Sequence, residues 1–359
     1  EGGEEATGLE CALHHCKVFH KKHPNHHSTT RDESRSMTSV VSDVRVPASR
    51  APHARASTPR RPWRGATLTR RASTTEASAT LKTQYTYLGG NSWFAQLGVS
   101  GVKVLCDPWL VGDLTFWDLP ALYTGRKASL EGSNDWMRVA ETADVILLSQ
   151  SWEDHCHKPT LRELPKDIPV VGSPAAVEVA KELGFSNATP LKANSQVRVR
   201  PRGDTDEAKE GLFLVAVAGA LVGPPWSTRE AGFILADGSE GARVYYEPHC
   251  SYVPESVKAG LRAVGGRVDC VVTPVRSVDV VGFPLVSGGS EAVDLLECLN
   301  RPGLVIPLRN GELKQDGVSA GLLGTDGTTG EGFAALCDER FGAGKVEVRM
   351  PTPGVAIDF

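Results

Sequence analysis

A short apolar run that opens directly onto polar side chains is the feature that most constrains this chain. Residues 145–148 are Val-Ile-Leu-Leu, which has the length and the β-branched content of a buried strand. Just after it come side chains that ligate metals or move protons, namely Asp154, His155, Cys156 and His157. A buried strand that delivers such groups to its own end predicts a chemical site at the rim of a sheet.

The same order of predicted elements occurs twice in residues 81–359. Short strands joined by glycine-rich turns are predicted within 83–106 and again within 212–247. Each set is followed by alternating helices and strands. The helices are predicted at 135–143, 173–183, 254–264, 290–300 and 330–341. This duplication predicts an α/β fold in which two sheets face each other with helices outside, an αββα four-layer sandwich.

A long segment without a predicted element, residues 110–134, lies between the first strands and the run at 145–148. Loops of this length inside compact domains are usually functional or disordered. Its aromatic and apolar content, including Phe116, Trp117 and Tyr123, favours a packed lid.

The first 80 residues differ from the rest in composition. From Met37 onward the chain is rich in Arg, Ser, Thr and Ala, with only Asp43 and Glu76 as acids before residue 81. This composition resembles a chloroplast transit peptide rather than a secretory signal, because an apolar core of roughly 7–15 residues is lacking. It also allows a disordered basic tail. We expect 1–80 to be a disordered leader, 81–359 to be the folded domain, and the location to be the plastid.

Charge and hydropathy narrow the classes of partner. Residues 81–359 hold 26 of the 39 basic and 35 of the 43 acidic residues, a net charge of −9, which argues against a nucleic-acid partner. No apolar run approaches the roughly 20 residues that span a bilayer, so no membrane span is expected. The eight Cys lack regular short spacings and are expected to be mostly reduced. Among these classes of partner, a small-molecule substrate or ligand is therefore the one expected.

Three segments together resemble the metallo-β-lactamase superfamily. They are Thr-Tyr-Leu-Gly-Gly-Asn-Ser-Trp-Phe at 86–94, Val-Leu-Cys-Asp-Pro-Trp-Leu at 104–110 and Leu-Ser-Gln-Ser-Trp-Glu-Asp-His at 148–155. The resemblance covers about residues 83–310 and is strongest to the lactonase-like zinc hydrolases. It implies the αββα fold and a His-x-His-x-Asp-His motif after a buried strand. In that motif two His hold one zinc ion, the Asp-His pair holds a second, and both activate a bridging hydroxide.

The chain matches only the second half of this motif. Asp154 and His155 fall on the Asp-His pair, whereas Gln150 and Trp152 fall where the first two His belong. Glu247 or His249 stands where the resemblance places an Asp that bridges both metals. Beyond residue 81 the chain has three His, and the resemblance implies about five for a dinuclear centre. We therefore expect at most one metal ion, zinc or another divalent cation.

The predicted ligands of that ion are Asp154, His155, His157, His249 and Glu247, with Cys156 and Cys250 as further donors. Asp154 and His249 are the predicted catalytic residues. Gln150, Trp152, Trp226 and Arg229 are the predicted substrate-binding residues, with Trp as a flat apolar wall and Arg for an anionic group. These roles predict a metal-dependent hydrolase for a small acidic ester, lactone or phosphoester.

Each of these predictions has a simpler alternative. Asp154 and His155 would then be a hydrogen-bonded pair that holds the loop, the tryptophans would be core residues, and Arg229 with Glu230 would be a solvated ion pair. Asp107, before Pro108, would cap a turn. Under these alternatives the chain is a non-catalytic pseudoenzyme that binds a metabolite or a partner protein.

Overall fold

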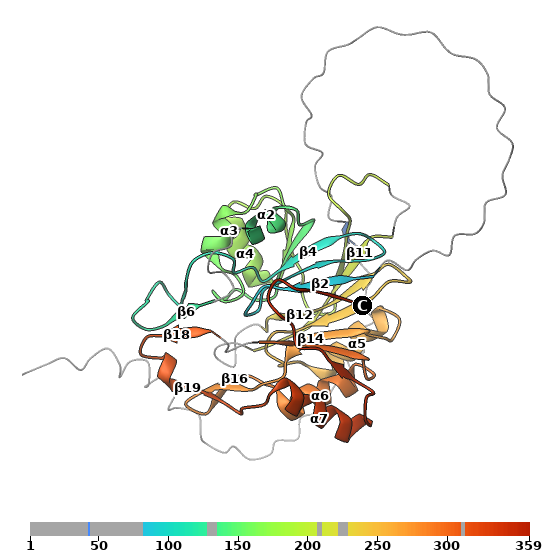
Figure 1. Cartoon of the computed structure of the whole chain (residues 1–359). Helices are drawn as coiled ribbons and strands as arrows, with labels where there is room; N and C mark the ends of the chain where they lie inside the picture. Colours follow the sequence, from blue (N-terminus) through green and yellow to red (C-terminus); the bar gives the residue numbers. More distant parts are fainter. Residues whose placement is uncertain (1–41, 44–81, 128–134, 207–209, 222–228, 310–312) are drawn as a thin grey trace, which may run out of the picture. The chain divides into compact units, whose positions relative to one another are not determined.

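The computed structural model describes residues 42–43, 82–127, 135–206, 210–221, 229–309 and 313–359 (Figure 1). Two large sheets form the centre of the fold. The first has the strand order β21-β2-β3-β4-β7-β8-β9. Its strands are β2 (Gln84–Tyr87), β3 (Trp93–Gln96), β4 (Lys103–Cys106), β7 (Val145–Leu148), β8 (Val170–Gly172), β9 (Ala188–Pro190) and β21 (Ala356–Asp358).

The second sheet has the order β1-β10-β11-β12-β13-β14-β17-β20. Its strands are β1 (Ser42–Asp43), β10 (Gln196–Val199), β11 (Leu212–Ala218), β12 (Ala231–Asp237), β13 (Arg243–Tyr246), β14 (Cys270–Pro274), β17 (Leu304–Leu308) and β20 (Glu347–Val348). The residues of β1 lie within the predicted leader, and they pair in parallel with β10 of the folded domain. The other residues up to 81, including the segment from Met37 that resembles a transit peptide, lie outside the described part of the chain.

Helices cover the outer face of each sheet (Figure 1). The first sheet packs against α2 (Asp135–Glu141), α3 (Lys158–Glu163) and α4 (Pro174–Glu182), and the second against α5 (Pro254–Ala263), α6 (Gly289–Cys298) and α7 (Gly330–Phe341). Ser173 caps α4 by accepting from the backbone N–H of Ala176, as the Ser-Pro pair predicts. The αββα four-layer sandwich is confirmed.

β7 shows how the sequence makes the layers. Side chains of a strand point alternately to opposite faces. Val145 and Leu147 therefore enter the core between the two sheets, while Ile146 and Leu148 enter the core beneath the helices of the first sheet. All four are fully buried, which explains why the run lacks the polar alternation of a surface strand.

Two small sheets that were not predicted lie outside the sandwich. One consists of β5 (Leu114–Thr115), β6 (Thr124–Arg126) and β18 (Lys314–Asp316). The other consists of β15 (Val278–Val280), β16 (Phe283–Val286) and β19 (Leu323–Thr325), with the 3₁₀-helix η2 (Ala320–Leu322) before β19. The aromatic loop at 110–134 is therefore partly regular structure. Its packing is confirmed in part: Leu114 and Tyr123 form a small core with Trp109, whereas Trp117 is 61% exposed.

Two composition-based expectations can be compared with the described residues. None of the helices described here is long and apolar enough to cross a membrane. The six cysteines in the described part of the chain are all free thiols, and five of them are buried.

Candidate metal centre

The candidate site lies where three strands end. Asp107 directly follows β4, residues 149–157 follow β7, and His249 follows β13 in the opposite sheet. β4 and β7 are parallel neighbours, so their carboxyl ends meet at the same edge of the sheet. This arrangement brings Asp107, His155 and His249, which are far apart in sequence, into one cluster.

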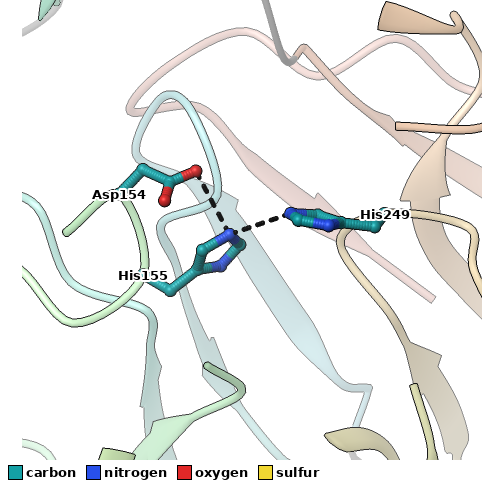
Figure 2. A group of neighbouring side chains, drawn as sticks. All are labelled: Asp154, His155 and His249. Atoms are coloured by element: carbon teal, nitrogen blue, oxygen red, sulfur yellow. Dashed lines mark hydrogen bonds and ion pairs between the residues drawn. The ribbon is translucent and has the colours of Figure 1, made fainter. Parts of the chain in front are cut away.

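Asp154, His155 and His249 form the cluster (Figure 2). One ligand atom from each lies within 4.8 Å of the other two. Nε2 of His155 is 3.2 Å from Oδ2 of Asp154 and 3.2 Å from Nε2 of His249. His155 is fully buried, and the other two are partly accessible. Of the predicted ligands, these three are the ones that the structure brings together.

Asp107 orients His155 by contacting the ring nitrogen that does not face Asp154 and His249. Its Oδ2 lies 2.8 Å from Nδ1 of His155 and accepts a 2.6 Å hydrogen bond from the hydroxyl of Tyr246. The same oxygen accepts from the hydroxyl of Ser149, and Oδ1 accepts from the Ser149 backbone N–H at 2.8 Å. Asp107 is therefore more than a turn cap. The sequence signal that could have identified it is an Asp at the end of the strand next to the motif strand.

The charges in the cluster are strongly coupled. Burial opposes a charge on His155, but Asp154 and Asp107 outweigh it and raise the pKa of His155 to about 10. Burial likewise opposes a charge on Asp154, yet the positive His155 lowers the pKa of Asp154 to about 2. Burial and the same positive charge lower the pKa of His249 to about 3. In the metal-free protein the imidazole of His155 is thus positively charged at neutral pH, with a proton on each nitrogen. The ring of His249 is neutral.

The donor atoms fit a small divalent cation. Ligand atoms about 2.0–2.1 Å from a zinc ion in tetrahedral geometry stand roughly 3.3 Å from one another. Both distances of 3.2 Å from Nε2 of His155 match that spacing. Two imidazoles and one carboxylate are also a set that leaves a position for water. A carboxylate on the far nitrogen of His155 is the usual partner of a metal-binding histidine.

His157, another predicted ligand, lies outside this cluster. Its Nδ1 accepts from the Thr160 backbone N–H and lies 2.9 Å from the Thr160 hydroxyl, so that it caps the first turn of α3. Its Nε2 lies 3.3 Å from the carbonyl oxygen of Asp113. Burial lowers its pKa to about 4, so the ring is neutral. The i, i+2 spacing to His155 does not bring the two rings together because the chain turns between them.

Replacing His157 with alanine is expected to lower stability without affecting metal binding. Loss of a helix N-cap costs about 1 kcal/mol, and truncation of the buried ring that packs against Trp109 adds a cavity cost of roughly 1–3 kcal/mol. Urea unfolding of the metal-free protein measures the total cost, and a competition titration with Zn²⁺ measures the metal affinity. His157→Asn is the matched control, because Asn is a good N-cap residue and should recover the part of the lost stability that is due to capping. A large loss of Zn²⁺ affinity in His157→Ala would contradict the capping role.

Glu247 is also absent from the cluster, although it is fully buried beside it. Its Oε2 accepts from the backbone N–H groups of His249 at 3.2 Å and Ser251 at 2.8 Å. These bonds hold the turn after β13, in which Cys250 has a positive φ of 50°. Burial raises the pKa of Glu247 to about 7. Its Oε2 therefore helps to place His249, while its Oε1 is buried without a hydrogen-bond partner among the described residues.

The predicted donors Cys156 and Cys250 are buried and outside the cluster. Burial raises the pKa of the Cys156 thiol to about 12, and it raises that of Cys250 further. Both thiols therefore stay protonated, which makes them poor ligands.

The predicted substrate-binding residues have varied surroundings. Gln150 is fully buried, and its amide oxygen and nitrogen have no hydrogen-bond partner among the described residues. Trp152 is half-buried and packs edge-on against Phe116 and Trp117 of the aromatic loop, with ring centroids 6.4 and 6.1 Å away. Arg229 is exposed and donates to the carbonyl of Gly219 at 2.8 Å. Trp226 lies outside the described residues.

The predicted ion pair of Arg229 with Glu230 is not the contact that the structure shows for either residue. Glu230 instead accepts from the hydroxyl of Ser151 at 3.2 Å, which ties the motif loop to β12. This contact spans the two sheets at the edge that carries the site.

Lys127 is a buried charge near the site that the sequence did not reveal. Its ammonium group donates to the carbonyl of Trp109 at 2.8 Å and to the hydroxyl of Ser92 at 2.9 Å, and it lies 4.5 Å from the centre of the Trp109 ring. Burial lowers its pKa well below the usual value, although Asp154 opposes the shift. Gly90 makes room for it, since a Cβ there would stand 3.2 Å from the Lys127 Cε.

Solved structures with the same fold support the architecture. A possible metal-dependent hydrolase from Veillonella parvula DSM 2008 has a TM-score of 0.55 at 15% identity, covering 77% of this chain and 99% of that one. An isothiocyanate hydrolase from Delia radicum gut bacteria has a TM-score of 0.54 at 15% identity, covering 76% and 98%. Igni18, a metallo hydrolase from Ignicoccus hospitalis KIN4/I, has a TM-score of 0.50 at 13% identity, covering 77% and 98%. At these identities the likeness concerns the fold alone.

The sequence match is to a family rather than to an individual protein. No curated protein is significantly similar to the chain in sequence. The family model described as the β-lactamase superfamily domain matches residues 84–309, which is more than half of the chain. That range contains both large sheets apart from their edge strands, and it contains the whole cluster of Asp154, His155 and His249. This protein belongs to the β-lactamase superfamily and has the metallo-β-lactamase fold.

Proposed function

We propose that this protein is a hydrolase that uses a single divalent metal ion, with zinc as the first candidate. One observation carries the proposal, namely the convergence of Asp154, His155 and His249 from opposite sheets on one point. Spacings of 3.2 Å between ligand atoms are those expected around a bound cation. The two His and one Asp that converge among the described residues are enough to bind one metal ion but too few to bind two.

The residues have separate roles in this proposal. Asp154, His155 and His249 would hold the metal ion, which when bound would lower the pKa of a water molecule and polarise a carbonyl or phosphoryl group. Asp107 fixes the tautomer of His155 so that Nε2 faces the cluster. Asp154 is ionised at neutral pH in the metal-free protein, so its carboxylate would be available as an anionic ligand. His249 supplies a neutral nitrogen from the other sheet.

The proposed substrate is a small acidic ester, lactone or phosphoester. Arg229 is exposed, and a guanidinium group has five N–H donors, so that donors remain beyond the bond to the Gly219 carbonyl for an anionic group. Trp152 follows the same strand as the ligands and, packed on Phe116 and Trp117, offers an apolar wall. These two features favour a substrate with one negative charge and an apolar body.

The experiment is to measure metal content and hydrolysis on the same preparation. Protein purified without chelator is expected to contain about one equivalent of a divalent metal, determined by plasma mass spectrometry. Its hydrolysis of a panel of acidic esters, lactones and phosphoesters should disappear with chelator and return with Zn²⁺. Less than a tenth of an equivalent of Zn, Fe and Mn together, with no uptake of added metal, would overturn the proposal.

A second candidate function rests on the charge state of His155. In the metal-free protein the protonated His155 lies between two carboxylates and compensates one of their two negative charges. This pairing gives both carboxylates a partner without a metal ion, which suits a non-catalytic protein that binds a metabolite. Under this alternative, His155→Ala and His249→Ala leave ligand binding measurable, and no hydrolysis appears with any metal.

A further inference from the structure

We infer that the side-chain carbonyl of Asn91 is a fourth ligand of the proposed metal ion, a role that the sequence did not suggest. The inference rests on the proposed function and adds a residue to it. Asn91 lies in the turn between β2 and β3 and is 6% exposed. Its amide group is 3.2 Å from Oδ2 of Asp154 and 3.1 Å from Nε2 of His155.

Asn91 thus adds a third neighbour to Nε2 of His155, which makes four candidate ligand atoms in all. Nε2 of His155 is 3.1 to 3.2 Å from each of the other three atoms, which belong to Asn91, Asp154 and His249. These spacings approach the roughly 3.3 Å between ligands of a tetrahedral zinc ion. A single proton on Nε2 can bond only one of the three neighbours well. A cation at the centre would contact all four.

The orientation of the Asn91 amide decides what it can do there. As placed, Nδ2 faces the cluster, and Oδ1 is buried without a hydrogen-bond partner among the described residues. The two ends of an amide are assigned from the surrounding hydrogen bonds rather than from shape. Rotation by half a turn brings Oδ1 to the same point, where a carbonyl oxygen can ligate a divalent cation. A bound metal favours that orientation, because it attracts the oxygen and repels the N–H groups.

The backbone holds Asn91 in place for this contact. Gly89 and Gly90 have φ values of 89° and 58°, which turn the chain sharply before Asn91. Ser92 closes the turn by donating its N–H to the carbonyl of Gly89 at 3.0 Å. The hydroxyl of Tyr246 donates its proton to Asp107 at 2.6 Å and lies 3.3 Å from the backbone carbonyl oxygen of Asn91, so one tyrosine contacts both sides of the cluster.

Replacing Asn91 with aspartate tests whether this side chain acts as a metal ligand or as a hydrogen-bond donor. Asn91→Asp keeps the size and provides a carboxylate oxygen, so Zn²⁺ affinity should stay within about threefold of the unaltered protein or increase. Asn91→Ala removes the oxygen and should weaken Zn²⁺ binding by about 100-fold or more, since even outer partners contribute about 10–100-fold. The affinity of the full chain for Zn²⁺ alone is measured by competition with a chromophoric chelator. Asn300→Asp, exposed after α6, is the control for added charge.

The outcomes distinguish this inference from the proposed function. If the unaltered protein binds one Zn²⁺ and Asn91→Asp weakens binding as much as Asn91→Ala, the amide is a donor, and this inference alone fails. The same holds if Asn91→Ala binds Zn²⁺ normally. If the unaltered protein binds no Zn²⁺, the proposed function and this inference fail together. Thermal unfolding of the metal-free variants shows whether each is folded, and Asn91→Asp remains informative even if Asn91→Ala does not fold.

Discussion

Replacing His249 with alanine is expected to weaken metal binding by more than about 100-fold and to reduce hydrolysis to background, while the protein stays folded. His249 is a proposed ligand, and loss of an outer partner alone costs about 10–100-fold in affinity. The hydrogen bond that the structure shows for its ring is to His155, and its backbone stays anchored to Glu247. Zn²⁺ titration, with unfolding of the metal-free protein measured in parallel, tests both parts of this expectation.

His155→Ala should abolish metal binding as well, but at a cost in stability. Removal of this ring leaves the buried Asp107 without its positive partner, and breaking a buried ion pair costs about 3–5 kcal/mol. The comparison between the two variants therefore separates metal loss from unfolding. His157→Ala is the matched control for an imidazole outside the cluster. Normal Zn²⁺ affinity in His249→Ala would contradict the site as described.

Asp107→Asn is expected to lower metal affinity by about 10–100-fold, although residue 107 would not touch the metal. The carboxylate receives bonds from His155, Ser149 and Tyr246, all of which are buried. An amide of the same shape carries one N–H₂ group that cannot accept from these donors. His155 then loses the partner that fixes its tautomer. A Zn²⁺ titration on the folded variant measures the effect.

Asp107→Ala should destabilise the protein about as strongly as His155→Ala. It leaves the donors of His155, Ser149 and Tyr246 unpaired in a dry environment and is expected to cost about 3–5 kcal/mol. Tyr246→Phe removes only one of these donors and should cost about 1 kcal/mol, so it serves as the graded control. Urea unfolding with chelator present gives both values. If Asp107→Ala were no more destabilising than Tyr246→Phe, Asp107 would not be the centre of the network.

The sandwich was predictable because its signals are local. The apolar run at 145–148, the Ser-Pro start of α4 and the glycine turns between β2, β3 and β4 each specify their own element through short-range chemistry. The two small sheets were not predictable in this way. β6 pairs with β18 and β15 pairs with β19, and strands of three residues carry little periodicity. Their pairing depends on segments that are far apart in sequence.

Which donors exist follows from the amino-acid sequence alone. Three His beyond residue 81, with Asp154 next to His155, are the basis on which at most one metal ion was predicted before any geometry was known. Which of these donors meet depends on the tertiary structure. It joined His249 from the second sheet to Asp154 and His155, and it removed His157 because the chain turns into α3 and uses that ring as a cap. It also brought Asp107 and Asn91 to the cluster. Sequence spacing describes neighbours along one element, whereas a site between two sheets depends on packing that no local pattern records.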